Sequence, residues 1–186
     1  MSSCGGEYTY PNPTDENELI RTVLTNSKVI VLIGASNKPV RPSNRVMKYL
    51  LNLGYTVIPV NPGLEKQTIH DQVVYKDLQS LPKDIVSQID IIDIFRNSDA
   101  VDSIVDDAIE TIMKNTNNDD NDDNNNKMKM KPTIWMQLDV INVNAATKAQ
   151  NAGFEVIMNK CPAIEIPKLD ITPKVSTTTT GTKPKL

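Results

Sequence analysis

The stretch from Ile30 to Gly63, IVLIGASNKPVRPSNRVMKYLLNLGYTVIPVNPG, contains the pattern of a strand, a turn, a helix and a second strand. Residues 28–34 form a continuous aliphatic run, which is typical of a strand covered on both faces in a parallel sheet. Apolar residues recur at helical spacing over 42–53, and Gly54 suits the position just past a helix end. Residues 55–60 predict the second strand. The stretch is therefore expected to form one βαβ unit.

The same alternation continues along the rest of the chain. We expect three more strands and three more helices, with Thr14 or Asp15 as the cap of the first helix. The predicted strands are 88–95, 132–138 and 154–158, and the predicted helices are 14–25, 98–114 and 142–152. Strands that alternate with helices predict an α/β fold, namely a single Rossmann-like doubly wound domain with a five-stranded, mainly parallel sheet.

Three segments fall outside this pattern. All but one of the residues from Asn115 to Asn126 are Asn or Asp, so this segment cannot contribute to a core. We expect a flexible arm at 1–13, a folded domain at 14–170 with a disordered insertion at 115–127, and a disordered tail at 171–186. A partner-binding role for the insertion is the less favoured alternative.

The charge balance limits the classes of partner. The formal net charge is −3, and four aspartates of the insertion account for it, so the rest of the chain is close to neutral. This balance argues against a nucleic-acid-binding protein and against a polybasic membrane surface. With no long apolar segment, no targeting leader and only two cysteines, Cys4 and Cys161, we expect a cytoplasmic protein.

The turn after the first strand, from Gly34 to Ser43, is expected to bind an anion. In open α/β sheets ligands lie outside the carboxyl ends of the strands, and this turn leads into a helix N-terminus. Gly34 permits a sharp exit from the strand, and the small residues Ala35 and Ser36 allow close approach to the backbone. The alternative is a plain connection built from small residues.

The residues of this turn favour a ligand with several phosphates over NAD. The G-x-G-x-x-G fingerprint is absent, and the second strand ends at neutral Asn61 where NAD-binding proteins have an acid. A P-loop is absent as well. Lys38, Arg41 and Arg45 cluster at the helix start, where cations oppose the helix dipole. They suit phosphate groups, or else form a solvated basic helix start.

Five motifs in order resemble those of a known family: GAS-x-K-P-x-R-P-S-x-R-V, GY-x-V-I-P-V-N-P, DI-F-R, WMQL and CP-x-I. The chain from Ser27 to Ile166 resembles the small stand-alone CoA-binding proteins, which are similar to the CoA-binding domain of succinyl-CoA synthetase. The resemblance implies a Rossmann-like domain that binds coenzyme A or an acyl-CoA at the carboxyl edge of its sheet.

The resemblance also implies which residues bind the cofactor. Gly34, Ala35 and Ser36 would face the pyrophosphate, and Lys38, Arg41 and Ser43 would contact phosphates, including the 3′-phosphate. The adenosine side would be lined by Asn61 and Pro62. The remaining implied positions are Phe95 and Arg96 after the third strand, Met136 and Gln137 after the fourth, and Cys161 after the fifth.

Evidence for catalysis in the sequence is weak. The single histidine, His70, has no recognisable partners and is expected to be an ordinary surface residue. Cys161 is expected to be a packing cysteine; alternatively, Lys160 favours its thiolate and it forms a mixed disulfide with CoA. We therefore expect a CoA-binding protein with no self-sufficient catalytic centre. The alternatives are an enzyme acting on acyl-CoA or a nucleotide through Cys161, and an NAD-binding oxidoreductase relative. A protein partner or a homodimer is left open.

Overall fold

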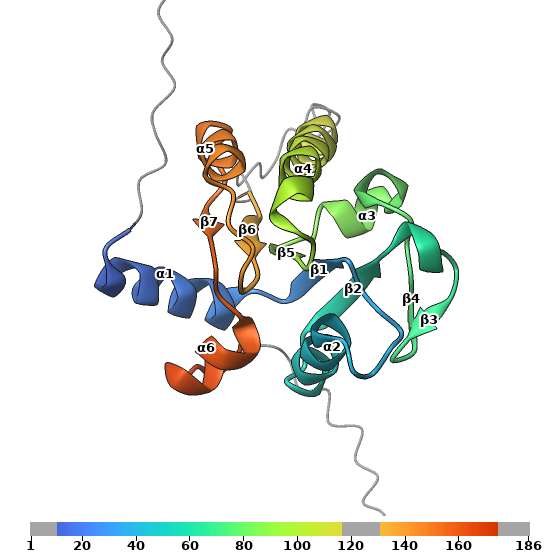
Figure 1. Cartoon of the computed structure of the whole chain (residues 1–186), viewed down its shortest axis with the longest axis horizontal. Coiled ribbons are helices and arrows are strands. Elements are labelled where there is room, and N and C mark those ends of the chain that lie inside the picture. The colour runs from blue at the N-terminus through green and yellow to red at the C-terminus, as the bar shows by residue number, and fades with distance from the viewer. Residues whose placement is uncertain (1–10, 117–130, 175–186) are drawn as a thin grey trace, which may run out of the picture.

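The computed structural model describes residues 11–116 and 131–174, and its centre is a parallel sheet (Figure 1). The expectations of a flexible arm, a disordered insertion and a disordered tail fall largely outside these residues. The five strands of the sheet are β1 (Val29–Ile33), β2 (Thr56–Val60), β5 (Ile91–Ile94), β6 (Thr133–Met136) and β7 (Val156–Ile157).

The strand order β2-β1-β5-β6-β7 confirms the predicted fold class, and all four pairings are parallel. From β1 the chain moves outward to β2, then crosses back over β1 to β5 and continues in the opposite direction. The strand order therefore reverses between β1 and β5, which is where open α/β sheets bind their ligands.

Helices cover both faces of the sheet (Figure 1). On one face lie α1 (Pro13–Asn26), α2 (Pro42–Asn52) and α6 (Pro162–Lys168), and on the other lie α3 (Lys83–Val86), α4 (Val101–Thr116) and α5 (Val143–Asn151). Alternate residues of β1 pack into the two layers. Ile30 and Leu32 join the core under α1, α2 and α6, whereas Val31 and Ile33 join the core under α4 and α5. This burial on both faces explains the uninterrupted aliphatic run of the strand.

The helix ends agree with the sequence except at the first helix. Asn12, rather than Thr14 or Asp15, is the N-cap of α1, because its side chain accepts hydrogen bonds from the backbone N–H groups of Thr14 and Asp15. Two helices end at glycines. Gly54 follows the C-terminal end of α2 and Gly153 follows that of α5, with φ of 93° and 81°, as expected for residues that stop a helix.

Several short elements lie between the predicted ones. The hairpin β3 (Thr68–Ile69) and β4 (Gln72–Val73) packs beside β2. His70 and Asp71 form its turn with φ of 48° and 63°, a left-handed conformation suited to a two-residue hairpin turn. Three single turns of 3-10 helix complete the structure: η1 (Pro62–Leu64), η2 (Leu78–Ser80) and η3 (Ser98–Ala100).

Among the residues that the structure describes, no helix combines the length and the apolar character required to cross a lipid bilayer.

Candidate functional site

The turn from β1 to α2 lies tightly against the end of β5. Gly34 has φ of 86°, and a Cβ at this position would lie 2.4 Å from the Phe95 carbonyl oxygen and 3.0 Å from Arg96 Cδ. Only glycine allows both this backbone conformation and this close approach. The two strands on either side of the reversal in strand order are therefore held together directly at their carboxyl ends.

Two asparagines hold the shape of this turn. Asn61, after β2, donates from Nδ2 to the Ala35 carbonyl oxygen at 2.7 Å and accepts from the Gly63 N–H at 2.9 Å. Asn44, in the first turn of α2, is buried and donates to the Ser36 carbonyl oxygen at 2.7 Å. Because both small residues of the turn have their carbonyls fixed from the sides, the turn is pre-formed.

The Ala35 and Ser36 carbonyls are bonded, but several N–H groups of the turn remain unbonded. Gly34 and Ala35 donate to the Val60 carbonyl oxygen. Arg41 is the N-cap of α2 without a capping side-chain bond, and the first turn of this helix holds no acidic residue. In the part of the chain that the structure describes, no hydrogen bond uses the backbone N–H groups of Ser36, Asn37, Val40 and Ser43. Free N–H groups at a helix start attract anions.

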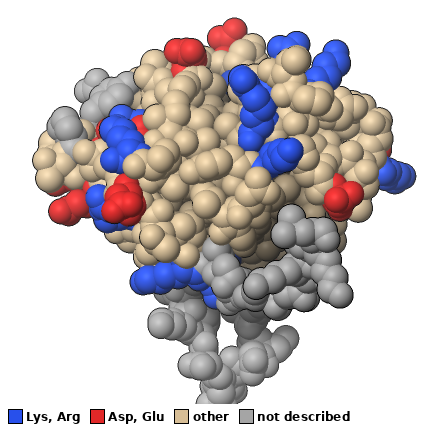
Figure 2. All heavy atoms as spheres, turned by 90° about the horizontal axis from the view of Figure 1, so that it is seen from below, with Lys and Arg blue, Asp and Glu red and all other residues tan. Residues whose placement is uncertain are grey.

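The cations expected near this turn are present and available. Lys38, Arg41 and Arg45 are exposed, and none makes an ion pair with another described residue. A fourth cation, Arg96, crosses over Gly34 from the end of β5. In Figure 2, which shows the molecule from the side of α1, α2 and α6, positive and negative residues are spaced among many uncharged ones, with no broad basic field.

Asp93 and Gln137 form a buried polar pair at the carboxyl ends of the neighbouring strands β5 and β6. Gln137, directly after β6, donates from Nε2 to both carboxylate oxygens of Asp93, at 2.8 and 3.1 Å. Asp93 is 0% exposed and Gln137 4%. Burial raises the pKa of the Asp93 carboxyl to about 7, and the hydrogen bond from Gln137 opposes this only in part.

Cys161 lies next to this pair and is buried as the N-cap of α6. Burial raises the pKa of its thiol, and the nearby Asp93 carboxyl raises it further. The alternative in which Lys160 favours the thiolate gains no support, because the Lys160 ammonium pairs with Glu16 at 3.0 Å. The surroundings of Cys161 thus favour the neutral thiol over the reactive thiolate.

The other residues expected in the site differ in their solvent exposure. Ser43 is buried in the first turn of α2, Pro62 is exposed at the start of η1, and Phe95 is half-buried. Met136 is fully buried in the core on the α4 and α5 side, and its backbone carbonyl accepts from the Lys160 N–H at 3.3 Å. The Met136 side chain therefore does not reach the edge; only its backbone lies there.

Two residues that the sequence did not single out for this site complete its framework. Asn44 places a polar amide among the buried positions of α2, and this break in the apolar face was the signal that could have revealed it. His70 lies against it, with Nε2 at 3.1 Å from both the carbonyl oxygen and Oδ1 of Asn44. Within the described ranges no group of acidic, histidine and cysteine side chains could hold a metal ion.

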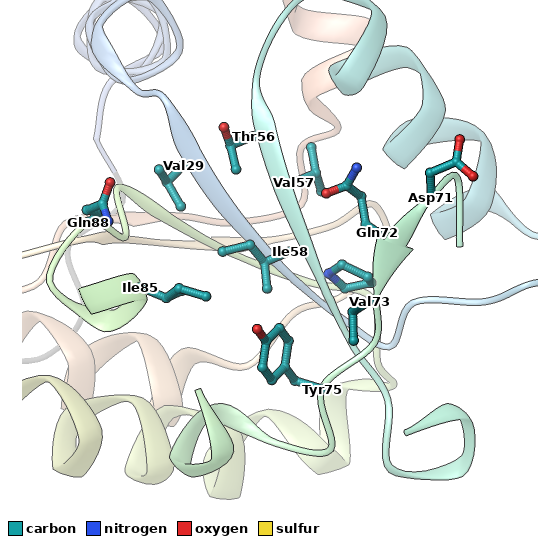
Figure 3. A pocket seen from close by; sticks show the side chains of 11 residues that line it. Val29, Thr56, Val57, Ile58, Asp71, Gln72, Val73, Tyr75, Ile85 and Gln88 are labelled. Atoms are coloured by element: carbon teal, nitrogen blue, oxygen red, sulfur yellow. The ribbon is translucent and has the colours of Figure 1, made fainter. Parts of the chain in front are cut away.

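A groove of about 330 Å³ lies elsewhere, along the outer side of β2 (Figure 3). Apolar side chains such as Ile58 and Ile85 line it together with Tyr75, and its polar residues include Asp71 and Gln88. No lysine or arginine lines it, and none of the expected cofactor-binding residues does. It is therefore not suited to a phosphorylated ligand.

The described residues form a Rossmann-like α/β fold, and comparison with known proteins specifies the family. Residues 28–167 match the family described as "CoA binding domain", so the chain belongs to this family.

Relatives and solved structures agree with this assignment. The chain is 31% identical over 142 residues to the protein YneT of Bacillus subtilis (strain 168), covering 76% of this chain and 87% of that protein. It is also 31% identical to a hypothetical protein from Pyrococcus horikoshii OT3, with a TM-score of 0.67 over 87% of this chain and 99% of the other. A Thermus thermophilus protein at 23% identity shares the fold, with a TM-score of 0.67 over 82% and 98% of the two chains.

Proposed function

We propose that this protein binds coenzyme A or an acyl-CoA at the carboxyl edge of its sheet, where the strand order reverses between β1 and β5. The observation that carries the proposal is the β1–α2 turn. It combines unbonded N–H groups with Lys38, Arg41 and Arg45, exposed cations that lack an ion-pair partner among the described residues. Oriented N–H groups and cations with no acid in the first turn suit a ligand with several phosphates.

Within this site the pyrophosphate lies against Gly34, Ala35 and Ser36. Lys38 and Arg41, with Ser43 of the first turn of α2, contact the phosphates, including the 3′-phosphate. The adenosine lies toward the end of β2, beside Asn61 and Pro62. Asn61 is neutral, so it does not repel a 3′-phosphorylated ribose as the acid of an NAD site would.

The opposite side of the edge receives the rest of the cofactor. Phe95 and Arg96 follow β5, Gln137 follows β6, and Cys161 is the buried N-cap of α6. The raised pKa of the Cys161 thiol favours a binding protein without a self-sufficient catalytic centre over an enzyme that uses this residue as a nucleophile.

The test is calorimetric titration of the purified protein with CoA, dephospho-CoA and NAD. We expect CoA to bind more tightly than dephospho-CoA and NAD to show no binding, because the basic turn contacts the 3′-phosphate. Equal affinity for CoA and dephospho-CoA would remove the 3′-phosphate from the basic turn. Absence of binding by all three would overturn the proposal.

A parallel incubation with acetyl-CoA tests for catalysis. We expect the thioester to remain intact over hours at a stoichiometric protein concentration. Turnover that is lost in Cys161→Ser would support the enzymatic alternative instead.

A further inference from the structure

The buried pair Asp93 and Gln137 has a geometry that core packing alone does not explain. The two residues come from neighbouring strands on the α1, α2 and α6 side, since Asp93 is in register with Trp135 and Gln137 follows two residues later. One amide nitrogen serves both carboxylate oxygens. Full burial of a carboxyl group costs free energy, and two apolar side chains could fill the same space in the core without this cost.

Among the described residues, no cation offsets this cost at Asp93. The titratable neighbours on the same side of the sheet are Cys161 and Glu165 of α6, and Glu165 pairs with Lys168 at 2.9 Å. From α2 the buried polar groups are the uncharged Ser43 and Asn44, and His70 of the hairpin bonds to Asn44. Among the described residues, Gln137 is thus the side chain that donates to Asp93.

Gln137 presents its other amide atom in the opposite direction. Its Oε1 accepts no hydrogen bond from the described residues, yet it is not among their fully enclosed unbonded polar atoms. The small exposed part of Gln137 therefore includes this oxygen. An ionised carboxylate only accepts hydrogen bonds, so Asp93 fixes which end of the carboxamide faces inward. An acceptor oxygen is consequently held at the carboxyl edge between β5 and β6.

We propose that Gln137 Oε1 accepts a hydrogen bond from the pantetheine arm of CoA, and that Asp93 is the positioning residue that keeps this oxygen turned outward. The inference rests on the proposed function and assigns a contact to the arm rather than to the nucleotide. With the phosphates over the β1–α2 turn and the adenosine beside Asn61, the arm extends from the reversal point toward β5 and β6. The arm carries two secondary amide N–H groups and a hydroxyl, which are donors for such an oxygen.

The arrangement gives the contact a dependence on pH. When Asp93 is protonated it becomes a donor, and the Gln137 carboxamide can turn so that Oε1 accepts from Asp93 and Nε2 faces the edge. The raised pKa of Asp93, about 7, places this change near neutrality. Binding of the arm is therefore stronger above pH 7 than below it.

The experiment compares CoA with adenosine 3′,5′-bisphosphate, which lacks the arm, by calorimetry between pH 6 and 8.5. The variants are Gln137→Met and Asp93→Asn, with Gln150→Met at an exposed position of α5 as the matched control. We expect both site variants to lose about threefold to tenfold in CoA affinity at pH 8, the range for one neutral hydrogen bond, with no change for the bisphosphate. We also expect the ratio of CoA affinity to bisphosphate affinity to increase with pH more in the native protein than in either variant. The 3′-phosphate is common to both ligands, and the 5′-phosphate monoester of the bisphosphate titrates in the same way with every protein variant, so the difference between native protein and variant isolates the effect of Asp93.

Each result has a distinct meaning. If CoA and the bisphosphate both bind but Gln137→Met lowers neither affinity, or if the ratio has the same pH dependence in the native protein and in Asp93→Asn, the inference is overturned and the proposed function stands. If the variants weaken both ligands equally, Gln137 acts on the fold rather than on the arm, which also overturns it. If the native protein binds neither ligand, the proposed function fails together with the inference.

Discussion

A Cβ atom added to Gly34 would lie 2.4 Å from the Phe95 carbonyl oxygen. The carboxyl ends of β1 and β5 therefore meet with no space for a side chain at Gly34. We expect Gly34→Ala to lower the free energy of unfolding by about 2–4 kcal/mol, because it adds a backbone clash to an unfavourable positive φ. Urea denaturation measures this. Gly63→Ala is the matched control, since its Cβ would meet only Asn61 Oδ1 at 3.4 Å. Equal effects of the two substitutions would contradict the role of the close approach.

The exposed Arg41 is expected to contribute to phosphate binding. Arg41→Ala should weaken CoA binding by about 1–3 kcal/mol, the range for a charge-assisted hydrogen bond, and leave stability unchanged. Lys48→Ala removes the same charge from an exposed position further along α2 and should have little effect. Calorimetric titration of both variants gives the comparison. An Arg41→Ala variant with native affinity would place this residue outside the site.

Asn61 has a donor role that aspartate cannot take over. Asn61→Asp would replace the bond to the Ala35 carbonyl with a repulsion between two oxygens, while keeping an acceptor for the Gly63 N–H. We expect a loss of about 1–3 kcal/mol in the free energy of unfolding. The exposed Asn144→Asp in the first turn of α5 is the control and should be neutral or slightly stabilising. If both variants unfold alike in urea, the bond to Ala35 has no structural role.

The raised pKa of Asp93 predicts how stability changes with pH. Its carboxyl has an ordinary value of 3.8 and a native value of about 7, so between these values the native state retains a proton that the unfolded chain releases. The free energy of unfolding therefore falls as pH rises through this window and levels off above pH 7. Asp93→Asn removes this contribution. The difference between native protein and variant, measured in urea from pH 5 to 8.5, isolates it. A difference that is constant with pH would show that Asp93 titrates normally.

Cys161 is expected to react slowly with thiol reagents. Burial raises the pKa of its thiol, so the thiolate fraction at pH 7 is small and access is limited. In a Cys4→Ser background, labelling with a chromogenic disulfide should accelerate markedly in mild urea, because opening of the fold controls access. Rapid labelling of the folded protein at pH 7 would instead support a reactive cysteine and the enzymatic alternative.

The architecture could be predicted because its signals are local. The aliphatic runs of β1 and β2 and the helical period of α2 each indicate their own structure. The β3–β4 hairpin gave no such signal, since each strand has two residues. The helix α6 was missed because Pro162 and Pro167 both suggest a break, although Pro162 occupies the permitted first turn.

The site was only partly predictable, because its contacts depend on which strands are neighbours. Gln137 was among the residues that the resemblance implies, and Asp93 lies within the predicted strand 88–95, but neither position indicated that the two side chains are in contact. Their pairing follows from the adjacency of β5 and β6, which join parts of the chain 44 residues apart. Likewise the bond from Asn61 to Ala35 spans 26 residues and was not visible in the motif that contains Asn61.

The packing of the first helix against the last has a consequence for biosynthesis. Arg21 donates to the Leu169 carbonyl across 148 residues of chain, and the Lys174 N–H donates to the Thr25 carbonyl. Because α6 follows β7 and has Cys161 as its N-cap, the layer beside Asp93 is incomplete until α6 has left the ribosome. The growing chain can form the β1–α2–β2 unit early, but it gains the full proposed binding surface only after α6 has been synthesised.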